Sequence, residues 1–555
     1  MTPAELSAAV LAALRDAVAA GDLSVPVPES ATVERPKNRE HGDYATNIAL
    51  QLAKPAGRPP REVAQILAAR LEATAGIKSA SIAGPGFLNI TLDAAAQGAL
   101  ARTIVQQGSS YGTGDALTGE QINLEFVSAN PTGPVHIGGV RWAAVGDALA
   151  RVLTAAGASV GTEYYFNDAG SQIDRFARSL MASAQGEPVP EDGYGGAYIS
   201  DIADRVVKLV PDVLSRPEAE AQEVFRQQGV ELMFAEIKQS LADFGVHFDR
   251  YFNEKDLHDR GELDAAVERL REQGRTYEKD GALWLRTTDF GDDKDRVVKR
   301  SNGEWTYFAA DCAYYLDKRM RGFDRIIIML GADHHGYIGR IKAMVACFGD
   351  DPERNVEILI GQMVNLVKDG EPVRMSKRAG TVVTLEDMVE LVGVDAARYS
   401  LARSSSDSQI NLDVNLLTKR ANDNPVFYVQ YAHARMCSVK RMATERGIDK
   451  GPAGDFDPTL LTHERESVLL GALGQFPRVV ELAARERAVH KIARYLEEQV
   501  APAFHKFWDE CHILPRPDDP VPPELTRARM WLAEAAQTAV ANGLGLLGVS
   551  APERM

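Results

Sequence analysis

A strand-like run, a short polar loop and a helix-like run follow one another at 121–153, and this order restricts the chain to few folds. Residues 121–127 are largely apolar, and 139–153 have helical periodicity. Further strand-like runs at 160–166, 325–330 and 356–360 alternate with helical stretches. This alternation predicts an α/β fold with a doubly wound, Rossmann-like parallel sheet. Ligands of such sheets bind at the carboxyl ends of strands, and His136 lies just past one such end.

A second segment, at 374–378, carries cations in a polar loop before a helix. Thr384 and Asp387 have the spacing of a capping box that begins this helix, and Gly393 ends it. A helix N-terminus offers N–H groups to an anion, and a lysine on a loop can follow charge between phosphates. His136 and Lys377 therefore predict two phosphate-facing elements, as nucleotide activation of a carboxylate requires.

These two segments resemble the His-Ile-Gly-His and Lys-Met-Ser-Lys-Ser signatures of class I aminoacyl-tRNA synthetases. The lead-in at 125–134, Glu-Phe-Val-Ser-Ala-Asn-Pro-Thr-Gly-Pro, is typical of the arginyl-tRNA synthetases. The resemblance continues at 36–45, 331–335 and 427–435, so it covers nearly the whole chain. Several agreeing segments in the family order are far more specific than either short signature.

The resemblance implies that His136 and Lys377 are catalytic and that both signatures bind ATP. The implied ATP site comprises Asn130, Pro131, Thr132, Gly133, His136, Gly138, Gly139, Met375, Ser376 and Lys377. At Gly139 the chain departs from the family, which usually has a second His there. Only a backbone N–H is then available at this position. Arg374 and Arg378 replace the first Lys and last Ser of the second signature.

A pocket for arginine needs carboxylates and an aromatic face, because guanidinium is a planar cation that pairs bidentately with carboxylates. The resemblance implies Glu125, Asn130, Tyr307, Asp311 and His334 for this pocket. If 307–311 is helical, Tyr307 and Asp311 share one face. The alternative interpretation of each carboxylate is a surface salt bridge or a helix cap.

His334 and His335, with Asp333, also suggest a metal site, but adjacent histidines rarely chelate one ion. The four cysteines are scattered and include no Cys-x-x-Cys pair. We therefore expect no metal held by the protein, and Mg²⁺ only as the ion that accompanies ATP.

The net charge of −16 argues against nucleic-acid binding when taken alone. Basic residues nevertheless cluster between 419 and 446 around an aromatic helix. We expect tRNA contacts from Lys419, Arg420, Tyr428, Gln430 and Arg435. Aromatic residues at helical spacing are usually core, and this alternative is strongest for Phe427 and Tyr431.

Three domains are expected. They are an N-terminal α+β domain that contacts tRNA (1–110), a catalytic domain (118–410, with an insertion at about 185–300) and an all-α helical anticodon-binding domain (412–555). The N-terminus lacks the pattern of a signal peptide, and no apolar run has the length of a membrane span. The expected protein is a cytoplasmic monomer.

The resemblance implies ATP-dependent ligation of L-arginine to its cognate tRNA, tRNA(Arg), through an arginyl-adenylate. Two alternatives stay open at this point. One is another class I ligase or a smaller nucleotidyltransferase, and the other is a non-catalytic RNA-binding paralogue. The long C-terminal helical region argues against a small transferase, and the presence of His136 and Lys377 argues against loss of catalysis.

Overall fold

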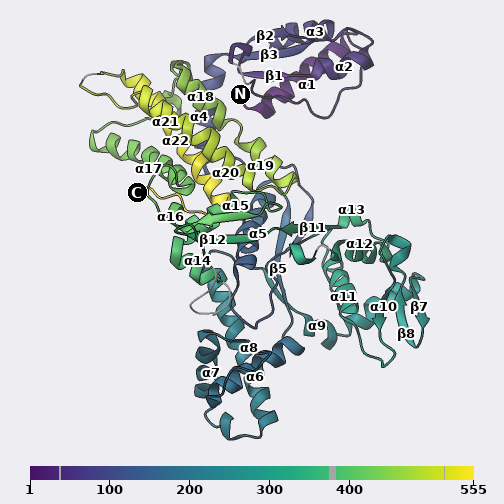
Figure 1. The fold of residues 1–555 in the computed structure, drawn as a ribbon. Helices are drawn as coiled ribbons and strands as arrows, with labels where there is room; N and C mark the ends of the chain where they lie inside the picture. The colour runs from purple at the N-terminus through teal and green to yellow at the C-terminus, as the bar shows by residue number, and fades with distance from the viewer. Residues whose placement is uncertain (37–38, 335, 374–382, 518) are drawn as a thin grey trace.

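The computed structural model describes residues 1–36, 39–334, 336–373, 383–517 and 519–555 (Figure 1). Its centre is a five-stranded sheet in the order β11-β10-β4-β5-β6, and all four pairings are parallel. The strands are β4 (Gln121–Glu125), β5 (Ser159–Phe166), β6 (Arg250–Asn253), β10 (Arg325–Gly331) and β11 (Val356–Gly361). The predicted α/β fold is confirmed. The strand order reverses between β4 and β10, where such sheets bind ligands.

The sheet separates two hydrophobic cores. On one face, Ile122 and Leu124 of β4 pack with α5 (Ile137–Ala155). On the other face, Ile326 of β10 packs with Ala309 and Cys312 of α11 (Tyr307–Met320) and with α12 (Tyr337–Cys347). The short α13 (Pro352–Asn355) leads into β11. The apolar run predicts that β4 reaches residue 127. The strand ends earlier because the backbone turns into the left-handed region directly after Phe126.

Two excursions leave the sheet between β5 and β10. The helices α6 (Ser171–Gln185), α7 (Ala197–Leu209) and α8 (Glu218–Asp243) pack on one another and project from the sheet (Figure 1). The second excursion contains α9 (Glu254–Asp259), α10 (Glu262–Glu272) and an antiparallel sheet of β7 (Thr276–Lys279), β8 (Ala282–Leu285) and β9 (Arg296–Lys299).

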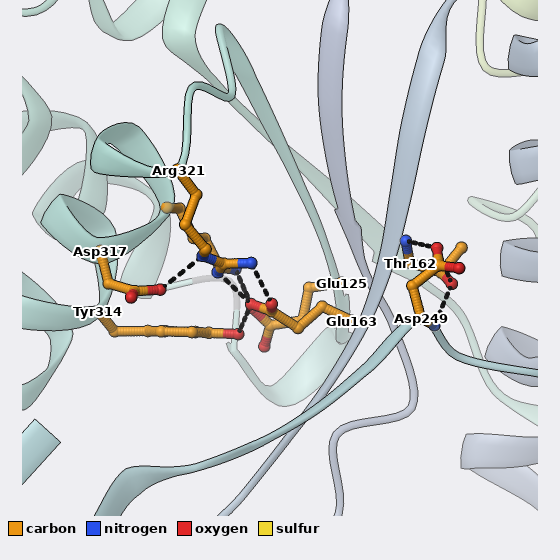
Figure 2. A network of polar contacts seen from close by, with 8 residues as sticks. Glu125, Thr162, Glu163, Asp249, Tyr314, Asp317 and Arg321 are labelled. Carbon is orange, nitrogen blue, oxygen red and sulfur yellow. Dashed lines mark hydrogen bonds and ion pairs between the residues drawn. The ribbon is translucent and has the colours of Figure 1, made fainter. Parts of the chain in front are cut away.

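Strand β6 lies between these excursions, so the stretch at 185–300 is not one continuous insertion. The strand has only four residues and lies at the edge of the sheet, too short for a clear alternation in the sequence. A polar contact fixes its start, because the Asp249 carboxylate accepts hydrogen bonds from the backbone N–H and the hydroxyl of Thr162 at 2.8 and 2.9 Å (Figure 2).

The N-terminal part has its own core, formed by residues from Leu6 to Leu92. It combines α1 (Pro3–Ala19), α2 (Ile48–Ala56) and α3 (Pro60–Glu72) with an antiparallel sheet of β1 (Tyr44–Thr46), β2 (Ile77–Ala83) and β3 (Phe87–Leu92). The next helix, α4 (Ala94–Gln107), packs instead on helices near the C-terminus. The separate core therefore ends short of residue 110, where the sequence suggests a boundary.

The C-terminal part is helical. It contains α17 (Pro425–Glu445), α18 (Glu464–Leu473), α19 (Phe476–Arg485), α20 (His490–Tyr495), α21 (Ala501–Glu510) and α22 (Pro523–Leu546). Between it and the sheet lie α14 (Leu385–Val392), α15 (Val394–Ala402), α16 (Val414–Leu417) and a small sheet of β12 (Val364–Lys368), β13 (Glu371–Pro372) and β14 (Ile410–Asp413). No helix in the described ranges is long and apolar enough to cross a membrane.

One buried side chain joins these parts of the molecule. Arg398 of α15 is fully buried and forms an ion pair with Asp147 of α5. It also donates to the carbonyl of Phe244 at the end of α8, at 2.9 Å, and to that of Leu547 after α22, at 3.3 Å. A buried guanidinium needs such partners for its donors. The α5 helix, the first excursion and the C-terminal helices are thereby held in one arrangement.

Candidate active site

The loop after β4 is strained and firmly held. Val127 and Ser128 have φ values of 68° and 44°, which are unusual for residues other than glycine and rarest for a β-branched one. The Ser128 hydroxyl donates to Glu125 Oε1 at 3.2 Å and accepts from the backbone N–H of Tyr165 at 3.1 Å. Asn130 Oδ1 accepts from the backbone N–H of Asn167 at 3.0 Å. The carboxyl ends of β4 and β5 are thus tied together.

The next residues face the first excursion. Pro131 is buried, and the Tyr198 hydroxyl of α7 donates to the carbonyl of Thr132 at 3.1 Å. A Cβ at Gly133 would lie 3.2 Å from that hydroxyl oxygen, so the glycine allows a close approach. The loop predicted to contact ATP therefore lies between the sheet and α7.

His136 is exposed and caps the N-terminus of α5. Its Nδ1 accepts a hydrogen bond from the backbone N–H of Gly138 at 3.2 Å, and a Cβ at Gly138 would lie 3.0 Å from its ring. The Gly139 N–H, expected to be available, donates to the His136 carbonyl at 2.8 Å. A Cβ at Gly139 would lie 3.1 Å from a methyl of Val135, so a larger residue there requires a small shift.

The residues that follow the second signature lie against His136. The backbone N–H of Ile137 donates to the carbonyl of Val383, and that of Leu385 to the carbonyl of Val135, both at 2.8 Å. These bonds flank an antiparallel bridge between His136 and Thr384. Thr384 also begins α14 with the predicted capping box. Met375, Ser376 and Lys377 lie outside the described residues, as does His335.

One face of α11 carries two of the residues expected to bind arginine. Thr306 caps the helix by accepting from the backbone N–H of Ala309. Tyr307, Asp311, Tyr314 and Lys318 follow at intervals of four, three and four residues and share one face. Tyr307 is 72% exposed and Lys318 only 1%, so this stripe runs from solvent to a buried floor. The predicted placement of Tyr307 and Asp311 on one helix is thus found.

At the buried end of this stripe, two carboxylates from the sheet pair with two cations from the end of α11. Glu125 is 7% exposed, and its Oε2 lies 2.5 Å from Lys318 Nζ. Glu163, which is paired in register with Glu125 across β4 and β5, accepts from the Tyr314 hydroxyl at 2.6 Å. Its other oxygen lies 2.7 Å from Arg321 Nη1. Figure 2 shows Tyr314 and Arg321 reaching from the helix toward the strand carboxylates.

Asp311 differs from its neighbours on the stripe. Burial and the nearby charge of Glu254 raise the pKa of its carboxyl to about 7, against the effect of Arg340. Glu254, at the start of α9, accepts from the Tyr165 hydroxyl at 2.5 Å. Burial beside this carboxylate raises the pKa of Tyr165 above its usual range. A cationic ligand beside Asp311 would therefore stabilise the ionised form of its carboxyl group.

Some residues of this site are not identified by the sequence patterns. They are Glu163, Tyr165, Glu254, Tyr314, Lys318 and Arg340. The helical spacing from Tyr307 contains the signal for Tyr314 and Lys318. The other four come from distant parts of the chain: Glu163 and Tyr165 from β5, Glu254 from α9 and Arg340 from α12. His334 is exposed at the carboxyl end of β10, in a short 3₁₀ turn, with its ring 5.6 Å from that of Tyr337.

The candidate tRNA-binding residues differ in exposure: four of them are at least partly exposed, and Gln430 is buried. Lys419 and Arg420 are exposed, with Lys419 Nζ 3.2 Å from Asp423. Tyr428 lies beside His505 with ring centroids 5.1 Å apart, and the Arg435 guanidinium lies 4.7 Å from the Trp508 ring centroid. Gln430, however, is 7% exposed.

The Gln430 amide donates to Asp395 Oδ2 at 2.8 Å and to the Ser550 carbonyl at 2.9 Å. Its geometry is that of a packing residue, because the phase of α17 turns it inward beside Val426 and Val429. Phe427 and Tyr431 stack with ring centroids 5.7 Å apart and are half-buried, so their packing role stays a prediction.

A groove of about 510 Å³ runs along the second half of α17. It lies between this helix, α22 and the C-terminal residues. Its basic lining residues are Lys440, Arg441 and Arg554, and Gln537 of α22 completes one side. In the described ranges no group of three or more His, Cys, Asp or Glu side chains could hold a metal ion.

Three family models match the chain in the order of its structural parts. Residues 4–92 match the arginyl tRNA synthetase N terminal domain, and 201–423 match the catalytic domain of class I (R) tRNA synthetases. Residues 429–555 match the DALR anticodon binding domain. The first match coincides with the separate N-terminal core that ends at Leu92.

Relatives and solved structures agree with these matches. The arginine–tRNA ligases of Kineococcus radiotolerans and Frankia alni are 63% and 58% identical, over the full length of both chains in each case. A solved Campylobacter jejuni protein described as an arginyl-tRNA synthetase is 33% identical with a TM-score of 0.75, covering 84% of this chain and all of that one. The Thermus thermophilus enzyme shares the fold over the full length of both chains (TM-score 0.73, 22% identity). The chain belongs to the arginine–tRNA ligase family of class I aminoacyl-tRNA synthetases.

Proposed function

We propose that the chain is a ligase that attaches L-arginine to its cognate tRNA at the expense of ATP. The arginine carboxylate attacks the α-phosphate of ATP, giving arginyl-adenylate and pyrophosphate. A terminal ribose hydroxyl of the tRNA then attacks the activated carbonyl carbon, and AMP leaves. The observation that carries the proposal is the stripe on α11, where an exposed Tyr307 leads to Asp311 above a buried floor of charges.

His136 is the group proposed to meet the α-phosphate. Its Nδ1 accepts from the Gly138 N–H, so in the neutral imidazole the proton is on Nε2. Nε2 can then donate to a phosphate oxygen as charge builds there during attack. The N-terminal end of the α5 dipole favours the same charge. Lys377 and its neighbours complete this site in the proposal, on the ground of the sequence resemblance.

Asp311 is the carboxylate proposed to pair with the substrate guanidinium. A bidentate pair stabilises the ionised carboxylate, which burial and Glu254 disfavour in the free site. Asn130, which joins the carboxyl ends of β4 and β5, is proposed to hold the backbone groups of the amino acid. Tyr307 is proposed as the aromatic rim, and His334 lines the neighbouring strand end.

The remaining assignments rest on composition and family. The N-terminal unit is proposed to contact the tRNA, and the helical unit to bind the anticodon through exposed Lys419 and Arg420 with Tyr428 and Arg435. The division at 118–410 and 412–555 is retained as a proposal, and the N-terminal unit expected at 1–110 is shortened to the part with its own core, which ends at Leu92. We further propose that Mg²⁺ enters with ATP as the counter-ion of its phosphates, and that the chain acts as a monomer in the cytoplasm.

Pyrophosphate exchange with each standard amino acid, in the presence and absence of total tRNA, tests this function. Exchange should occur with arginine and exceed that with lysine, because only the guanidinium fork matches a carboxylate bidentately. Family resemblance predicts that tRNA is needed even for this first step. Exchange with another amino acid, or none with arginine under either condition, would contradict the proposal.

A further inference from the structure

Arg141 of α5 is a buried cation that is held by neutral acceptors. It is 1% exposed, and its guanidinium donates to the backbone carbonyls of Gln362 and Ser408 at 2.8 Å and to that of Ser405 at 2.7 Å. Burial lowers the pKa of this guanidinium, and the charge of the exposed Asp407 only opposes the effect. Burying a cation without a close counter-ion is costly, so stability alone does not explain an arginine at this position.

The carbonyls that Arg141 holds lie where the chain leaves the sheet. Strand β11 ends at Gly361, and the next residue, Gln362, also donates through its backbone N–H to the Ser406 carbonyl at 2.9 Å. The neighbour of Arg141 on α5, Trp142, packs on the same point, because a Cβ at Gly361 would lie 2.3 Å from its indole ring. The end of β11 is thus fixed between α5 and the loop before β14.

The end of β11 belongs to the edge of the sheet where a ligand is expected. Gly361 is paired with Gly331 at the carboxyl end of β10, beside the point where the strand order reverses. Helix α5 begins at the same edge, directly after His136. Met363, which follows the end of β11, is 66% exposed, so a flat apolar ring can pack on its side chain. One helix therefore joins the group proposed to meet the α-phosphate to an exposed apolar side chain at the same edge.

We propose that Arg141 is a positioning residue for ATP: it fixes the end of β11, where Met363 receives the adenine ring, to the helix whose N-terminus receives the α-phosphate. This inference rests on the proposed function and adds a residue to it. The ribose between adenine and the α-phosphate limits how far apart these groups can lie. A protein that holds both groups at a matching separation places the α-phosphate for attack, and a displacement of about 1 Å can cost about 10²-fold in rate.

Ligands that contain only one end of ATP separate this role from simple packing. Arg141→Lys keeps the positive charge but loses the planar set of donors that reaches three carbonyls. The experiment measures the KM of ATP and of pyrophosphate in tRNA-supported exchange, the inhibition constant of adenosine and the dissociation constant of arginine. Arg141→Lys should raise the ATP KM and the adenosine inhibition constant about tenfold, because a misaligned polar contact costs about that much. The pyrophosphate KM and the arginine dissociation constant should stay unchanged.

Equal weakening of all four ligands would overturn the inference, because a residue that only stabilises the fold has no reason to act on the adenosine end alone. An unchanged adenosine inhibition constant would overturn it as well. Arg141→Lys leaves buried carbonyls short of donors, so it can fail to fold. Met363→Ala then decides, because this side chain is exposed. A raised adenosine inhibition constant in Met363→Ala supports the inference, and an unchanged one shows that the end of β11 does not receive adenine.

Arg529→Lys is the matched control. The Arg529 side chain, in α22 of the helical C-terminal part, is 12% exposed, pairs with Glu466 and donates to the His512 carbonyl, both at 2.7 Å. This variant should leave the ATP and adenosine constants unchanged, and a change like that in Arg141→Lys would refute a specific role for Arg141. Wild-type exchange with arginine tests the proposed function separately. If the wild-type chain shows that exchange and Arg141→Lys binds adenosine equally well, only the inference about Arg141 fails.

Discussion

At the scale of single residues, Asp311 is the side chain on which the candidate arginine site most depends. Asp311→Asn should raise the arginine KM far more than the ATP KM, because it removes a charged hydrogen-bond partner of guanidinium. The loss of such a buried pair costs roughly 2–4 kcal/mol, or about 30- to 1,000-fold in KM. Steady-state exchange kinetics measure both constants. Asp264→Asn on the exposed face of α10 is the control, and an unchanged arginine KM in Asp311→Asn would remove Asp311 from the pocket.

The raised pKa of Asp311, about 7, gives a second prediction at this scale. Guanidinium pairs with the ionised carboxylate, so arginine affinity should be constant above pH 7 and fall about tenfold per pH unit below it. In the free protein, the contribution of Asp311 to stability depends on pH in the opposite direction. Native Asp311 keeps a proton that the unfolded chain loses near pH 4, so its contribution to the free energy of unfolding falls as pH rises from 4 to 7. Calorimetric titration with arginine at pH 6 and 8 tests the first statement, and Asp311→Asn should show no such pH dependence.

Lys377 carries a third prediction, which rests on the sequence signature. Lys377→Ala should lower kcat for adenylate formation by about 10²–10³-fold and leave arginine binding nearly intact, because the ammonium group meets charge that develops only during phosphoryl transfer. Single-turnover adenylate formation and equilibrium arginine binding separate the two effects. Lys368→Ala, an exposed lysine at the end of β12, should retain wild-type kcat. A wild-type rate in Lys377→Ala would rule out the assigned role.

At the scale of elements, the start of α14 connects the two signatures. Thr384 is fully buried, caps α14 and lies in the bridge to His136. Thr384→Ala should cost about 1 kcal/mol of stability because the cap is removed, and it should also lower kcat, because the cap holds the chain that follows the second signature against His136. Thr2→Ala removes an equivalent capping box from α1, far from the site. Thermal unfolding and exchange rates distinguish them, and an equal decrease of kcat in both variants would refute the link.

At the scale of the whole molecule, a negatively charged protein must bind tRNA, which is also negatively charged. The net charge is −16, yet Lys419 and Arg420 present exposed cations beside the aromatic helix α17. Replacing both with Ala should weaken tRNA binding and flatten its salt dependence. The slope of log K against log salt should fall by about 0.7–0.9 for each phosphate that the protein no longer neutralises. Arginine and ATP affinities should stay unchanged.

Filter binding across a range of salt concentrations measures the salt slope. Arg269→Ala/Arg271→Ala on α10 makes the same change in net charge on the opposite side of the sheet in Figure 1, and it is the control. An unaltered slope in the Lys419/Arg420 variant would show that tRNA binds to another surface of the protein. An equal effect in both variants would indicate that only net charge matters.

Local patterns in the sequence were enough for the main elements. Apolar runs at 121–127, 325–330 and 356–360 predicted three strands, because buried parallel strands need side chains that are apolar on both faces. The structure has these strands at Gln121–Glu125, Arg325–Gly331 and Val356–Gly361, so their existence was predicted correctly and their ends only to within two residues. The capping box at Thr384 predicted the start of α14, and helical spacing placed Tyr307 and Asp311 on one face of α11. Each of these inferences depends on interactions within a few residues along the chain.

Tertiary structure decided what those elements meet. The Glu125–Lys318 pair joins residues 193 apart, and local periodicity contains no information about such a contact. The inward phase of Gln430 depends on where α17 meets Asp395 and Ser550. The bridge from His136 to Thr384 depends on the return of the chain to the sheet after two excursions. The sequence by itself determined which residues carry charge and how each helix presents them. Only packing in three dimensions determined which charges are already paired and which are open to substrate.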